Sequence, residues 1–218
     1  MKVGEAVNRV QSLYNRGAKP SSSRLTDRHA YNLIKTGRAL AIKDSRYQGQ
    51  WAYMPIGCTR IMKVSAAECG CSPSFGVSFF RSKYKIPTPL KADAYFMSVL
   101  SVDNSVEFSQ TTWEAARYNS SSRFAKKVPQ WYIKDGYLFV ISPSNIGTLV
   151  LNAVWFDPVA AAMYNYEETG SCVIAQEVDL GIDSDLWERT FAHAKEELVM
   201  FVQMEEDGTQ DSKDKPGK

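Results

Sequence analysis

The stretch WYIKDGYLFVISPSNIGTLVLNAVWFDP, from Trp131 to Pro158, decides the fold because its pattern and its turn residues agree. Asp135-Gly136 is typical of a two-residue hairpin turn, where both central residues need positive φ and glycine supplies it without steric cost. The turn sets the register, which predicts four facing pairs: Lys134 with Tyr137, Ile133 with Leu138, Tyr132 with Phe139 and Trp131 with Val140. A second turn at 143–147 and the apolar run 148–156 predict a third strand, covered on both faces, in an antiparallel meander.

The length of 218 residues suits one domain, or one domain with an arm, and allows a sizeable core. No apolar run approaches the roughly 18 residues of a membrane span, and residues 1–17 do not resemble a secretory signal. We therefore expect a soluble intracellular product. The cysteines are too sparse for a disulfide framework, which predicts free thiols at Cys58, Cys69, Cys71 and Cys172.

The net charge of +2 hides a strong asymmetry along the chain. Residues 1–50 carry ten Lys/Arg and three Asp/Glu, whereas residues 166–218 carry five Lys/Arg and fourteen Asp/Glu. Opposite poles on one subunit favour head-to-tail contact between copies, and a basic pole could instead face nucleic acid. The alternative is that each pole is only a solvated surface.

Apolar spacing predicts two helices in the N-terminal region, one over about 3–16 and one from Thr26 or Asp27 to Asp44. The second has an apolar stripe that includes Ile34 and Gly37, and its other faces are basic. We predict that these faces meet nucleic acid or a protein partner through Arg24, Arg28, Lys35, Arg38, Lys43 and Arg46. A nucleic-acid-binding module built on helix 24–46 is therefore an alternative function, although no known nucleic-acid-binding signature accompanies it.

Between the basic region and the opening stretch, the pattern changes to that of short strands. A strand is predicted at 59–64. Pro87 and Pro89 exclude a helix and a central strand from 78–89, which leaves an extended edge. A strand pair is predicted in 95–107 with Asp103-Asn104 at its turn, followed by a short helical or turn segment near Ala115.

After Pro158 the sequence predicts a single helical turn at 159–165 and then a clear amphipathic helix at 184–204. Asp183 and Asp185 suit the start of that helix, and Trp187, Phe191 and Leu198 mark its buried stripe. The predicted fold class is α+β, with an antiparallel β-sheet or sandwich core, two N-terminal helices and a C-terminal amphipathic helix. The predicted divisions are a basic helical region at 1–50, the β core with its helix at 51–204 and a polar tail at 205–218.

Catalytic and metal-binding templates fail, so we predict no enzyme, no cofactor and no metal. There is no nucleophile elbow, phosphate-binding loop or dinucleotide fingerprint. His193 to Glu197 is not a zinc-protease motif, because no Glu follows His193 and position 197 is not a second histidine. The spacing of Cys58, Cys69 and Cys71 does not supply the paired ligands of a structural zinc site.

An ordered set of segments over most of the chain resembles the head–tail connector proteins of tailed bacteriophages, especially short-tailed phages of the crAss-like group. The segments are SSSRLTDRHAYNLIKTGRALAIK at 21–43, IGCTRIMKV at 56–64, FFRSKYKIPTPL at 79–90, WYIKDGYLFV at 131–140, LVLNAVWFDP at 149–158 and IDSDLWERTFAHAKEELVMF at 182–201. None of these segments is specific alone, and the resemblance rests on their order.

The resemblance implies a structural subunit of a homo-oligomeric, commonly dodecameric, ring that stacks under the portal and forms part of the DNA channel. Such a portal adaptor serves virion assembly and DNA ejection. The implied partners are the portal, neighbouring neck and tail ring proteins, and genomic DNA that passes through the lumen without sequence-specific contact. No membrane is implied. The implied location is the neck or tail of the virion, after assembly in the host cytoplasm.

Overall fold

The structure is a computed structural model that describes residues 1–15, 25–44, 53–69, 77–91, 95–119, 128–169 and 174–210. The chain divides into two compact units. Residues 1–51 and 175–218 form the first, called here the helical unit, and residues 52–174 form the second, called the barrel unit.

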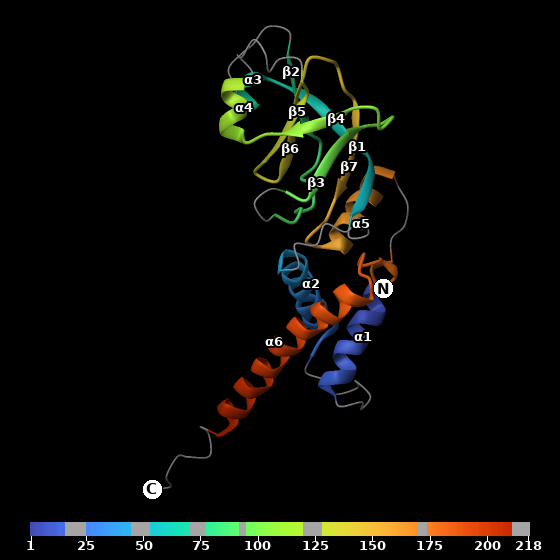
Figure 1. The fold of residues 1–218 in the computed structure, drawn as a ribbon, viewed down its shortest axis with the longest axis vertical. Helices are drawn as coiled ribbons and strands as arrows, with labels where there is room; N and C mark the ends of the chain where they lie inside the picture. The colour runs from blue at the N-terminus through green and yellow to red at the C-terminus, as the bar shows by residue number, and fades with distance from the viewer. Residues whose placement is uncertain are drawn as a thin grey trace. The chain divides into compact units, whose positions relative to one another are not determined.

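The helical unit contains three long helices that pack on one another (Figure 1). They are α1 (Val3–Tyr14), α2 (Asp27–Asp44) and α6 (Ser184–Gln210), and a short 3-10 helix at Ala175–Glu177 precedes α6. The helix α6 is longer than the sequence predicts, because it continues beyond residue 204 to Gln210. The chain start is held by Asp179, whose carboxylate lies 3.2 Å from the Met1 ammonium group.

Small residues let α2 and α6 approach closely. Ala30, Gly37 and Ala41 are buried on α2, and Thr190 and Ala194 are buried on α6. At the start of α6, the Asp183 carboxylate accepts a 2.7 Å hydrogen bond from the Leu186 amide. This is the N-cap arrangement that satisfies a backbone donor left over at a helix start. The contact between α2 and α6 is the main packing interface of the helical unit.

The barrel unit is a closed barrel in the strand order β1-β2-β6-β5-β4-β3-β7 (Figure 1). Its seven strands are β1 (Met54–Val64), β2 (Ser78–Ser82), β3 (Met97–Ser101), β4 (Glu107–Gln110), β5 (Gln130–Lys134), β6 (Tyr137–Ser142) and β7 (Thr148–Ala153). Every neighbouring pair is antiparallel except β4 and β5, which are parallel.

The predicted fold class, an antiparallel sheet or sandwich, is wrong because the sheet closes on itself. Closure depends on β1, whose first part pairs with β7 and whose last part, Ile61–Val64, pairs with β2. The register of β1 shifts between Ile56 and Thr59, an irregularity of the kind that bends a strand at a barrel corner. The β1–β7 pairings join residues 88 to 99 positions apart in the chain, so local spacing carries no signal of them.

The hairpin at the centre of the opening stretch is confirmed. Asp135 and Gly136 have φ values of 53° and 81°, and all four predicted pairs from Lys134–Tyr137 to Trp131–Val140 are present. The predicted meander is wrong in its third strand, because β7 pairs with β1 and β3 and not with β6. The two faces of β7 also differ: Leu149, Leu151 and Ala153 are buried, whereas the alternating residues are half-buried.

The segment with two prolines was predicted to be an extended edge, and this is wrong for its first part. Ser78–Ser82 forms β2, which is paired on both sides by β1 and β6. Pro87 and Pro89 follow the strand, where Leu90 donates a 2.7 Å backbone hydrogen bond to Val154. The predicted strand pair around Asp103-Asn104 is confirmed as β3 and β4, with Asn104 at a φ of 55°.

The fold-class prediction named only three helices, whereas the described residues contain six α-helices. The three additional helices are α3 (Ala66–Cys69), α4 (Trp113–Asn119) and α5 (Pro158–Thr169). The helix α5 has 12 residues where one turn was predicted. It packs against β1.

The barrel has an apolar cluster inside and a second one outside. Inward residues include Phe80, Trp131, Leu138, Val140 and Leu151. The outer cluster comprises Phe79, Ala116, Tyr132, Phe139 and Ile141, so α4 covers this part of the wall. The period of two along each strand places neighbouring residues on opposite faces, which explains why one hairpin supplies both clusters.

Candidate functional site

The basic residues predicted to face a partner take different positions on α2. Arg28 and Lys43 are exposed. Lys35 is half-buried, with its Nζ 5.8 Å from the centre of the Tyr31 ring. Arg38 is fully buried. Arg24 and Arg46 lie outside the described residues, so the structure places neither of them.

Arg38 binds within the helical unit and does not reach the surface. Its Nε donates a 2.8 Å hydrogen bond to the carbonyl of Leu180, which connects α2 to the segment before α6. Burial lowers the pKa of Arg38 to about 10, partly offset by Tyr31, so the guanidinium remains charged at neutral pH. The sequence contained a signal for this burial, because Arg38 follows Ile34 by four positions on a helix and shares its face.

Most of both charge poles of the sequence lies within one unit. Residues 1–51 contain ten Lys/Arg and three Asp/Glu, and residues 175–218 contain five Lys/Arg and twelve Asp/Glu, so the helical unit has no formal net charge. Residues 52–174 contain eleven Lys/Arg and nine Asp/Glu, a net charge of +2. The two poles are in contact where the Nε2 atom of His193 lies 3.4 Å from the Asp44 carboxylate. The asymmetry along the chain therefore does not produce two oppositely charged units.

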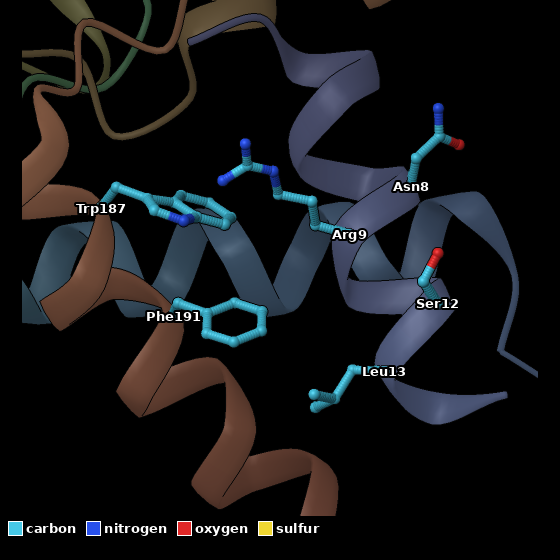
Figure 2. A pocket seen from close by; sticks show the side chains of 6 residues that line it. All are labelled: Asn8, Arg9, Ser12, Leu13, Trp187 and Phe191. Atoms are coloured by element: carbon cyan, nitrogen blue, oxygen red, sulfur yellow. The ribbon is translucent and has the colours of Figure 1, made fainter. Parts of the chain in front are cut away.

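A groove of about 510 Å³ lies between α1 and α6 (Figure 2). Its lining residues are Asn8, Arg9, Ser12, Leu13, Trp187 and Phe191. The Arg9 guanidinium lies 5.7 Å from the centre of the Trp187 ring, and the Trp187 and Phe191 rings are 5.4 Å apart. Figure 2 shows Arg9 extending from α1 toward Trp187. The groove thus combines an aromatic wall on α6 with one cation on α1.

The polar groups of the groove are few. No carboxylate, imidazole or thiol is among its lining residues, so the Ser12 hydroxyl has no general base beside it within the groove. In the part of the chain that the structure describes, no group of three or more His, Cys, Asp or Glu side chains could hold a metal. The side chains of Cys58, Cys69 and Cys71 are outside that part.

No helix among the described residues is long and apolar enough to cross a membrane. A family model described as phage tail ring protein 2 matches residues 5–215. The match extends over nearly the whole chain and includes residues of both units. No curated protein sequence matches the chain.

Proposed function

The chain belongs to the phage tail ring protein 2 family of crAss-like phages, and from this premise we propose that it is a subunit of a homo-oligomeric ring in the head–tail connector. In this proposal the ring stacks under the portal and forms part of the channel for the genome. Membership of a tail ring family makes the protein a structural component of the virion tail. The match over residues 5–215 is the observation that carries the proposal, because it extends over both units.

The net charge of the sequence is compatible with a DNA channel. Each phosphate that a protein neutralises adds affinity, so a strongly basic lumen would hold the genome and slow its passage. Net charges of zero and +2 for the two units avoid this. In this proposal the exposed Arg28 and Lys43 of α2 contact neighbouring ring proteins, whereas their contact with nucleic acid belongs to the alternative below.

The assembly of the full chain tests this proposal. Native mass spectrometry and negative-stain electron microscopy of the purified protein, alone and with the portal, are expected to show closed rings and a ring–portal complex. Closed rings that do not bind the portal would contradict the proposed position under the portal but would support the proposed ring. A monodisperse monomer under all these conditions would contradict the proposal.

The alternative, a nucleic-acid-binding module on α2, is disfavoured because Arg38 is buried. The double variant Arg28→Ala and Lys43→Ala tests it against Lys195→Ala, a matched exposed lysine on α6. We expect the wild type, the double variant and Lys195→Ala to bind a short DNA duplex equally weakly at about 50 mM salt. A marked loss of affinity and a smaller salt dependence in the double variant alone would favour the alternative.

A further inference from the structure

A cluster of cations and aromatic rings lies on the outer wall of the barrel unit. We call Arg81, Lys85, Trp113, Lys134 and Tyr137 the basic aromatic patch. The Arg81 guanidinium and the Lys85 Nζ lie 4.9 and 5.8 Å from the centre of the Tyr137 ring, and the Lys134 Nζ lies 4.5 Å from Trp113. Cation–π contacts hold a cation in place without neutralising it. The patch therefore presents positive charge in a fixed geometry.

The patch has an excess of positive charge. The Arg117 guanidinium also lies 5.1 Å from the centre of the Trp113 ring. Glu114 and Asp135 are the acidic neighbours along the chain, and both are exposed. Within the described ranges, no ion pair joins Arg81, Lys85 or Lys134 to a carboxylate. The described side chains of this wall thus leave cations available to an acidic partner.

The tip of the β3–β4 hairpin, Ser101 to Glu107, has the opposite character. Val102 and Val106 are 51% and 43% exposed, which is high for valine, and Asp103 and Glu107 are exposed beside them. Side-chain hydrogen bonds connect the residues of the tip: the Asp103 carboxylate accepts hydrogen bonds from the hydroxyls of Ser101 and Ser105, and the Val106 amide donates to the Ser101 hydroxyl. The tip offers apolar surface and negative charge together.

The patch and the tip lie apart on the same barrel. The tip precedes β4, whereas α4 with Trp113 follows the end of β4, and Figure 1 shows the tip and α4 at opposite sides of the barrel unit. The two surfaces of one copy are thus separated by the barrel wall. Contacts between two different surfaces of successive copies generate rings when the rotation closes.

We infer that the β3–β4 tip of one copy docks on the basic aromatic patch of the next copy and forms a repeating contact of the ring. The inference rests on the proposed function, because it assumes a ring. Glu107 of one copy faces the patch cations of the next, and Val102 and Val106 cover the exposed parts of its aromatic rings. Complementary charge sets the register and orientation of such a contact.

A second copy fits the patch better than DNA does. Single-stranded nucleic acid binds by stacking bases on aromatic faces, but cations already stack on Trp113 and Tyr137. Duplex binding is typical of a basic patch or stripe of Lys and Arg, whereas exposed carboxylates of Glu114 and Asp135 flank this patch along the chain. DNA binding is therefore an outcome that the test must separate.

Charge reversal in the full chain tests the contact by sedimentation velocity and native mass spectrometry. Lys134→Glu and Glu107→Lys, each alone, are expected to raise the concentration needed for half-assembly at least about tenfold, because each places like charges in contact. Lys195→Glu on α6 is the control with the same change of charge and is expected to assemble like the wild type. Circular dichroism verifies that all variants are folded.

Mixing the two variants gives the decisive result. In an equimolar mixture, every contact of an alternating ring pairs a lysine with a glutamate again, so we expect rings to return. Wild-type rings with undiminished assembly of both single variants would overturn the inference and leave the proposed function standing. Assembly unchanged but duplex DNA affinity reduced by Lys134→Glu would make the patch a DNA surface and also overturn it. A wild-type chain that stays monomeric, with or without the portal, would contradict both the proposed function and this inference.

Discussion

Replacing Gly37 with alanine probes the close approach of α2 to α6. A Cβ atom at position 37 would lie 2.7 Å from the backbone oxygen of Thr190 and 3.4 Å from the Ala194 nitrogen. The first distance is roughly 0.8 Å shorter than the about 3.5 Å at which nonbonded atoms attract. Because a backbone oxygen inside a helix cannot rotate away, the two helices must move apart to accept the methyl group.

The net effect is the difference between two opposing terms. Alanine inside a helix is more favourable than glycine by about 1 kcal/mol. Overpacking of a well-packed contact costs about 1–3 kcal/mol, and the rigid contact at Thr190 places Gly37→Ala in the upper part of that range. We therefore expect a net loss of about 1 to 2 kcal/mol in the free energy of unfolding of the helical unit. Gly37→Val, with two more carbons, should lose more.

Hydrogen exchange followed by mass spectrometry measures the stability of α2 and α6 separately from that of the barrel unit. Urea unfolding provides a second measure. Asn32→Ala is the control, since Asn32 is exposed on the same helix and the change gains helix propensity without adding bulk. We expect faster exchange in α2 and α6 for Gly37→Ala, and unchanged or slower exchange for Asn32→Ala. Equal or greater protection in Gly37→Ala would refute the close packing of the two helices.

Three other changes test separate parts of the fold. Gly136→Val forces a β-branched residue to a φ of 81° and should lower barrel stability by about 1–2 kcal/mol in urea unfolding, whereas Gly147→Ala, with open space around it, should not. Asp183→Ala removes the α6 cap and should lower stability by about 1 kcal/mol, a loss that Asp183→Ser should largely restore. Hydrogen bonds from Ser101 and Ser105 lower the pKa of Asp103 to about 2, so carbon NMR titration should show a midpoint there, and Ser101→Ala should move it up toward 3.8. Because the folded pKa is lowered, the stabilisation of the hairpin tip by this carboxylate is present above the ordinary pKa and is lost as pH falls through about 2.

The candidate site shows how far a helix pattern can be read. The exposed positions of Arg28 and Lys43 agree with a basic surface on α2, but Arg38 is buried because α6 and the segment before it cover that face. The spacing places Arg38 on the face of Ile34, but it does not state which distant element covers that face. The groove between α1 and α6 was also not foreseen, because its residues come from positions near 10 and near 190.

The sequence by itself determined the features that depend on neighbours along the chain. Asp135-Gly136 set the register of one hairpin, Asp103-Asn104 located the turn of another, and apolar spacing located α1, α2 and the start of α6. Only the tertiary structure decided that β7 leaves β6 for β1 and β3, that the sheet closes, and that α6 packs on α2. The physical reason is that turn geometry and helix periodicity act within a few residues, whereas closure and helix packing are set by surfaces that meet only after the chain has folded.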